Sequence, residues 1–156
     1  MLVVILLVAV LALAAAGGLA VWIRRGRSLR RVIDAPDSQA SRTINGDVMS
    51  RYLMTSASLG RLEFHDWGIR IRGIVISRWV VPTWEARYEE LAIAELVASQ
   101  WSRLAIWFKL RDQAGGIGFL THFSEEALRR LEEHGVPVNR SVIKFRQVSE
   151  LYGTRK

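Results

Sequence analysis

The stretch RLEFHDWGIRIRG, residues 61–73, decides the fold class of this chain. Its apolar side chains alternate with charged ones on both sides of a central turn, at Leu62, Phe64, Ile69 and Ile71. Alternation with a period of two is typical of strands that bury one face. Gly68 favours a tight turn between the strands, because glycine tolerates a positive φ. The stretch therefore predicts a β-hairpin with one apolar face.

The period of two continues after this hairpin. Alternation is clear in WEARY (84–88), and AELVA (94–98) indicates a short strand. RLAIWFKLR (103–111) alternates as well, with Trp107 on the face opposite its apolar neighbours, and IGFLTHF (117–123) returns after a glycine-containing turn. Together these segments predict six or seven strands.

The period becomes helical after the last of these strands. Ala127, Leu128 and Leu131 form one apolar stripe. Ser124 is predicted as the N-cap of this helix, and Gly135 as its C-terminal cap. The predicted fold class is therefore α+β, with bent antiparallel β-sheets whose apolar face is covered by one C-terminal helix.

The N-terminal residues differ in composition from the rest of the chain. The run LVVILLVAVLALAAAGGLAVWI (2–23) contains no charged side chain. As a helix it would be roughly 33 Å long, which is enough to cross a hydrocarbon core of about 30 Å. Trp22 stands at its end, where an indole suits the headgroup region. We therefore predict a transmembrane helix at residues 1–23.

Five arginines follow the apolar run directly and form a candidate membrane-interface cluster: Arg24, Arg25, Arg27, Arg30 and Arg31. They carry five of the seven excess positive charges, so the rest of the chain is nearly balanced and nucleic-acid binding is not expected. Arginines beside a span are retained on the cytoplasmic side. The predicted protein is a single-pass protein of the cell membrane, with its N-terminus outside and its C-terminal domain in the cytoplasm.

A cleavable signal peptide is the alternative to the membrane anchor. Small residues at 12–16 resemble a cleavage site, and cleavage there would release a secreted domain. Two features argue against it. No basic residue precedes the apolar run, and the run is longer than the usual apolar region of about 7 to 15 residues.

The predicted parts of the chain are a transmembrane helix, a basic juxtamembrane segment with a linker, a folded domain and a C-terminal tail, at residues 1–23, 24–58, 59–138 and 139–156 respectively. In the linker, Asn45-Gly46-Asp47 is a turn signal. VMSRYLM (48–54) fits either a short helix or an extra strand. The tail fits a further strand, a helix or a partner-binding extension.

This order of strands closed by one helix resembles the bacterial pleckstrin-homology-like (PH-like) domains, particularly small membrane-anchored ones. The resemblance covers about Leu59 to Val138 and rests on RLEFHDWGIRIRG, VPTWEARYEEL leading into AELV, the hairpin from Arg103 to Phe123, and SEEALRRLEEHGV. It implies two near-orthogonal antiparallel sheets with a helix at one end, in a binding or scaffolding module. Phosphoinositide-binding members use a basic loop between the first two strands. The matching loop here, residues 65–68, lacks a cluster of basic residues, so phosphoinositide binding is not expected.

No residue pattern indicates catalysis or a cofactor. The chain has no cysteine, which excludes disulfides and thiolate chemistry. His65-Asp66 with a serine would resemble a hydrolase triad, but a triad also needs defined placement and an oxyanion hole. We expect His65 to be exposed at a strand end. His65, His122 and His134 lack metal-ligand spacing, so no metal, no cofactor and no enzymatic activity are expected.

The tryptophans are the strongest candidates for a binding surface. Trp84 is in phase with Tyr88 and is predicted to lie in the core. Trp67 at a hairpin tip, Trp101 in a loop and Trp107 are candidates for contacting a protein partner, and covering the sheet faces is their alternative role. The sequence thus predicts a membrane-anchored, non-enzymatic interaction or scaffold module that binds a protein or a membrane complex. A membrane-associated enzyme subunit with an unrecognised site is the alternative.

Overall fold

The structure is a computed structural model that describes residues 30–36, 38–49, 59–74, 81, 83–98, 104–113 and 116–144. Among these residues, no helix is both long and apolar enough to cross a bilayer. The predicted transmembrane helix, residues 1–23, lies outside the described residues. So do several of the candidate site residues, namely Trp22, Arg24, Arg25, Arg27 and Trp101.

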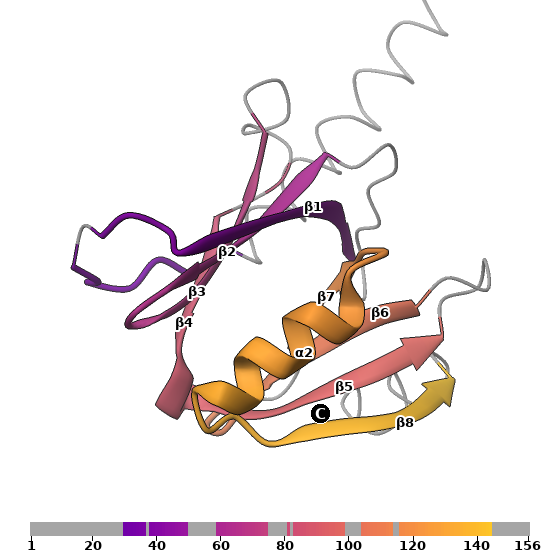
Figure 1. The fold of residues 1–156 in the computed structure, drawn as a ribbon. Coiled ribbons are helices and arrows are strands. Elements are labelled where there is room, and N and C mark those ends of the chain that lie inside the picture. The colour runs from indigo at the N-terminus through magenta and orange to yellow at the C-terminus, as the bar shows by residue number, and fades with distance from the viewer. Residues whose placement is uncertain are drawn as a thin grey trace, which may run out of the picture.

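The described residues form a sheet-dominated domain with one α-helix (Figure 1). The strands are β1 (Arg42–Met49), β2 (Gly60–His65), β3 (Gly68–Gly73), β4 (Trp84–Arg87), β5 (Leu91–Ala98), β6 (Leu104–Leu110), β7 (Gly116–Leu120) and β8 (Val138–Lys144). The helix α2 is Ser124–Glu133, and a short 3-10 helix, η2, is Tyr88–Glu90. The strand order is β4-β3-β2-β1-β7-β6-β5-β8. This confirms the coarse fold class, with more strands than the sequence predicted.

Strand β1 joins two halves of the sheet. Residues 42–46 pair with β2, and residues 47–49 pair with β7, both antiparallel. We call β4-β3-β2-β1 the first half-sheet and β1-β7-β6-β5-β8 the second half-sheet. Gly46 stands where β1 changes partner, and a Cβ there would collide with the carbonyl oxygen of Leu120 and lie 2.7 Å from the Phe119 ring. Glycine therefore allows the close backbone approach that bends the sheet.

The sheet begins earlier than residue 59, where the sequence placed the start of the folded domain. Strand β1 lies within the stretch assigned to the linker, and Val48 and Met49 belong to it. The Asn45-Gly46-Asp47 turn signal is therefore wrong in this fold, because Gly46 bends a strand instead of ending one. The rest of VMSRYLM lies outside the described residues.

The apolar core lies between the two half-sheets and α2, which crosses their open side (Figure 1). It contains Phe64 from β2, Phe108 from β6 and the helix residues Leu128 and Leu131, all fully buried. Trp84 also packs there, as the sequence predicted. The aromatic and branched side chains of the alternating strands thus meet the single apolar stripe of the helix.

The helix boundaries differ slightly from the prediction. Ser124 is the first helical residue, and Phe123 stands at the N-cap without a side-chain cap bond. The C-terminal cap is confirmed, because Gly135 has a φ of +76° and its N–H donates to the Glu132 carbonyl at 2.9 Å. A positive φ of this size favours glycine over any residue with a Cβ.

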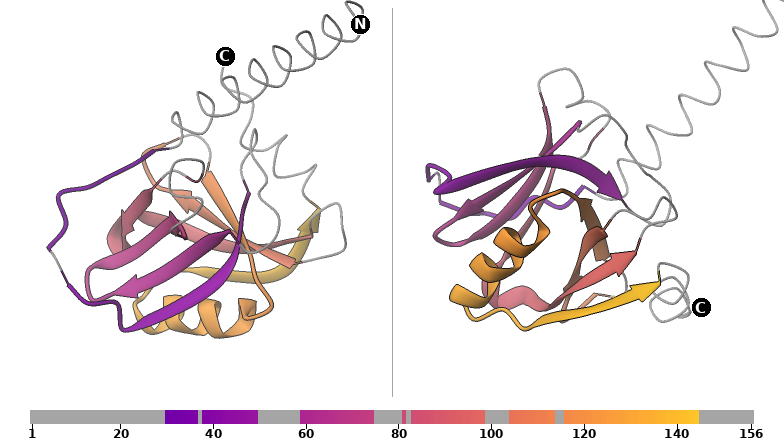
Figure 2. Two further views of the ribbon diagram at one scale, coloured as in Figure 1. Left: turned by 90° about the horizontal axis from the view of Figure 1, so that it is seen from above. Right: turned by 45° about the vertical axis from the view of Figure 1, so that its right-hand side comes forward.

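The first part of the tail is a strand. Strand β8 pairs with β5 in parallel, so the sheet is mixed and the prediction of purely antiparallel sheets is wrong at this edge. Figure 2 shows β5 and β8 side by side with the same direction. The register of the β5–β8 pairing shifts between Asn139 and Ile143, as at a β-bulge. Residues 145–156 lie outside the described residues.

A second apolar cluster covers the other face of the second half-sheet. Its buried members are Met49, Val97, Ala105, Trp107 and Leu120. Trp107 therefore points away from Ile106 and Phe108, which lie in the main core, as the alternation predicted.

Candidate functional site

The first described segment, residues 30–36, is bonded to the outer edge of β4. The Arg31 N–H donates to the Thr83 carbonyl at 3.1 Å, and the Glu85 N–H donates to the Arg31 carbonyl at 2.9 Å. These bonds form a parallel bridge between Arg31 and Trp84. The chain is thus attached to the sheet eight residues after Ile23, where the apolar run ends.

The Arg31 side chain strengthens this attachment. Its Nη2 lies 2.8 Å from Glu90 Oε1, and its Nη1 donates to the Glu85 carbonyl at 2.7 Å. Partial burial raises the pKa of Glu90, but hydrogen bonds from Arg31 and from the Arg87 backbone outweigh burial and hold that pKa below its usual value. Arg31, predicted as a membrane-interface residue, therefore binds the domain itself.

The first described segment alternates between inward and outward residues. Arg31 and Ile33 are half-buried, and the Ile33 N–H donates to Glu85 Oε2 at 3.0 Å. Arg30, Val32 and Asp34 are exposed. Successive side chains of an extended segment point to opposite sides, so the bonded side of the segment leaves Arg30 and Val32 facing solvent.

The outer face of the first half-sheet carries buried carboxylates, each paired with an arginine. Glu63 and Glu85 are only 3% and 4% exposed. Arg72 Nε donates to Glu63 Oε1 at 2.7 Å, and Arg70 Nε donates to Glu85 Oε1 at 2.6 Å. Burying an ionised carboxylate is unfavourable unless it is paired and hydrogen-bonded. These ion pairs therefore connect β3 to its two neighbouring strands, β2 and β4.

His65 is buried, not exposed as the sequence predicted, with 2% of its surface accessible. Its Nδ1 lies 3.0 Å from the carbonyl oxygen of Ser38 and 3.1 Å from the Ser38 Oγ. A carbonyl oxygen only accepts, so Nδ1 carries the proton and donates it to Ser38. The segment before β1 thus covers the ring, a long-range contact that alternation in the sequence does not reveal.

Ser38, His65 and Glu63 resemble a serine–histidine–carboxylate array, because His65 Nε2 lies 3.6 Å from Glu63 Oε2. In a hydrolase triad the histidine nitrogen next to the serine must accept the hydroxyl proton. Here that nitrogen already donates to the Ser38 carbonyl, so it has no lone pair for the hydroxyl. Asp66, the acid suggested by the sequence, is exposed. The arrangement therefore holds the segment before β1 against β2, and it is not a nucleophilic centre.

The candidate tryptophans fall into different environments. Trp67 is half-buried, stacks on His65 at 5.0 Å between ring centroids and carries the Arg70 guanidinium 5.7 Å from its ring centre. Trp107 is only 4% exposed, so it presents no ring to a partner in this structure. Trp101 lies outside the described residues, so only Trp67 and Trp107 are placed by the structure.

The other histidines lie apart from His65. His134 stacks on Tyr88 with ring centroids 4.1 Å apart, and His122 is exposed. Burial and the nearby Asp66 carboxylate raise the pKa of Tyr88 to about 12, and its hydroxyl donates to the His65 carbonyl at 2.9 Å. In the part of the chain that the structure describes, no cluster of three metal-ligating side chains forms.

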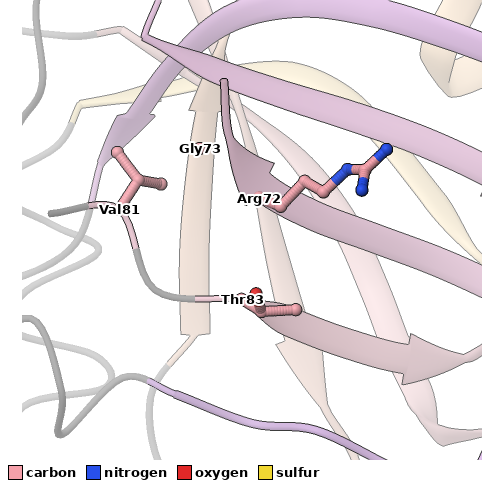
Figure 3. A pocket seen from close by; sticks show the side chains of 4 residues that line it. All are labelled: Arg72, Gly73, Val81 and Thr83. Atoms are coloured by element: carbon pink, nitrogen blue, oxygen red, sulfur yellow. The ribbon is translucent and has the colours of Figure 1, made fainter. Parts of the chain in front are cut away.

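A small cavity of about 180 Å³ lies at the end of β3, lined by Arg72, Gly73, Val81 and Thr83 (Figure 3). In Figure 3 the Arg72 side chain extends away from Val81, and its guanidinium binds Glu63. The Arg72 guanidinium is thus directed out of the cavity, so it offers no positive charge to an anionic ligand there.

Some apolar side chains remain exposed on the described surface. Val32 and Phe123 are each 55% exposed, Val142 is 54% exposed and Leu104 is 37% exposed. Phe123 is the only aromatic one among these four, and it stands directly before α2. The alternating pattern placed it at a strand end, and nothing in that pattern marked it as exposed.

No protein-family model matches this sequence, and no curated protein is significantly similar to it.

Proposed function

We propose that this chain is a membrane-anchored, non-enzymatic interaction or scaffold module of the cytoplasmic face, built on a PH-like domain. The order of elements supports the fold. Strand β1 is shared by two half-sheets, and α2 follows β7 and crosses the open side between them. Strand β8 departs from this pattern, because it adds a parallel strand after the helix.

The observation that carries the proposal is the direct attachment of Arg31 to β4 and Glu90. The apolar run ends at Ile23, so only a short connection separates the proposed span from the folded domain. A domain attached this closely stays at the membrane surface, which raises its effective concentration for other membrane partners.

The polar residues of the outer face support a non-enzymatic role. Glu63 and Glu85 are occupied by Arg72 and Arg70, and His65 is held by Ser38. A catalytic group needs a free lone pair or proton directed at a substrate. The two carboxylates are directed at arginines and stabilise the sheet, and the His65 ring is buried away from any substrate that arrives from solvent.

Phe123 is the side chain best placed to contact a protein partner. An aromatic residue that is 55% exposed and stands at the N-cap of α2 offers a large apolar area with little loss of conformational entropy. Trp67 presents part of its ring at the β2–β3 turn. A protein partner is therefore expected to engage the helix N-terminus through Phe123, whereas Trp67 lies near the other end of the helix, where His134 stacks on Tyr88.

Photo-crosslinking in cells tests this function. A photo-reactive phenylalanine analogue is introduced at position 123 of the full-length chain, and at Glu133 as the control. Glu133 is similarly exposed, at 52%, and lies at the other end of the same helix. We expect a discrete crosslinked protein at position 123 in the membrane fraction and none at position 133. Equal or absent crosslinking at both positions contradicts the interaction role.

A further inference from the structure

We infer that the β4 edge of the domain rests on the anionic surface of the bilayer, with Val32 in the interface and Arg30 beside the lipid phosphates. This inference rests on the proposed membrane anchor and names a lipid surface as the contact of one edge of the domain.

The length of the connection limits how far this edge can lie from the membrane. Arg31 follows Ile23 by eight residues, and its backbone is bonded to Thr83 and Glu85 on β4. Even a fully extended chain spans at most about 3.6 Å per residue, so the edge lies within roughly 30 Å of the end of the apolar run. The β4 edge is therefore the part of the described sheet with the shortest chain connection to the end of the apolar run.

The direction of the side chains determines which groups the β4 edge presents to the bilayer. The Arg31 guanidinium turns to Glu90 and the Glu85 carbonyl, so it is not directed at the lipid. Arg30 and Val32 flank it and lie on the opposite side of the segment. Both are exposed, Val32 to 55%.

The chemistry of the two residues fits an anionic lipid surface. Arg30 is exposed, and a guanidinium suits the oxygens of a phosphate, with which it forms charge-assisted hydrogen bonds. Val32 offers an apolar group next to it, a combination typical of interfacial contacts. Asp34 is exposed two residues further on, and its negative charge ends the contact region there.

Val142 provides a matched control. It is the same residue type, it is 54% exposed, and it lies on β8 at the opposite end of the strand order. The chain has no cysteine, so Val32→Cys and Val142→Cys each create a single labelling position. Neither residue belongs to the buried core.

The experiment uses the full-length chain, labelled at one position with an environment-sensitive fluorophore and reconstituted into vesicles. One set of vesicles contains phosphatidylcholine alone, and the other contains about 30% phosphatidylserine. We expect brominated lipids to quench the position-32 probe at least threefold more than the position-142 probe, and more strongly in the anionic vesicles. Arg30→Gln should remove the dependence on phosphatidylserine, and Arg30→Lys should retain it.

Resistance to alkaline extraction, measured on the same vesicles, distinguishes failure of the membrane anchor from failure of the β4-edge contact. If the chain is extracted, the anchor and the proposed function fail. If the chain resists extraction but both probes are quenched equally, only the contact of the β4 edge is overturned. Quenching at position 32 that is independent of phosphatidylserine overturns the role of Arg30.

Discussion

The guanidinium of Arg31 lies 2.8 Å from the carboxylate of Glu90, across 59 residues of sequence. Glu90 also accepts a hydrogen bond from the Arg87 N–H at 2.7 Å. The carboxylate thus joins the first described segment, residues 30–36, to the turn between β4 and β5.

Breaking this pair should lower the stability of the domain modestly. Both side chains are partly exposed, so we expect Arg31→Ala to reduce the free energy of unfolding by about 1 kcal/mol. Chemical denaturation of Arg31→Ala, Glu90→Gln and the double variant measures the coupling. If the two single effects simply add, the pair does not stabilise the domain.

The contribution of Glu90 should depend on pH in a defined direction. Its pKa is lowered in the folded protein, so its stabilisation is present above the unfolded value of about 4.5 and is lost as pH falls through the folded pKa. We expect the stability difference between the natural protein and Glu90→Gln to shrink below about pH 4.5. A difference that stays constant from pH 7 to pH 3 would show that the carboxylate charge is not involved.

The hydrogen bond from His65 to the Ser38 carbonyl should contribute more to the stability of the fold than the contact with the Ser38 hydroxyl. His65→Ala leaves the Ser38 carbonyl without its donor and removes a buried side chain, which costs about 1–3 kcal/mol of unfolding free energy. Ser38→Ala keeps the carbonyl and should cost less than about 1 kcal/mol. Thermal and urea denaturation compare the two. Equal losses would mean that the hydroxyl, and not the carbonyl, holds the ring.

The bend of β1 should be intolerant of a side chain. A Cβ at Gly46 meets backbone and an aromatic ring, so Gly46→Ala should destabilise the fold by about 3 kcal/mol or more. Gly135→Ala is the control. A Cβ at Gly135 meets no atom within 4 Å, so this substitution costs only the strain of a φ of +76°, about 1–2 kcal/mol. If the two variants unfold at the same denaturant concentration, the bend does not depend on close approach at Gly46.

Local periodicity predicted the elements whose neighbours are close in sequence. The β2–β3 hairpin, the alternation around Trp107 and the helix stripe ending at Gly135 were all readable from it. Each of these depends on side chains two to four residues apart.

Long-range contacts were not readable from the sequence. Gly46 lies in a turn signal, yet it bends a strand because Leu120 packs against it. His65 is buried by Ser38, and Arg31 is bound by Glu90, each from a distant part of the chain. In both cases one of the two residues, Ser38 or Arg31, lies before β1 in the stretch that the sequence analysis assigned to the linker.

Intact mass measurement of the chain in alkali-washed membranes tests the central claim most directly. We expect a membrane-bound protein with a mass of about 17.7 kDa, in which residues 1–23 are retained. A smaller protein in the aqueous fraction, beginning near residue 17, would contradict the anchor and the functions that follow from it.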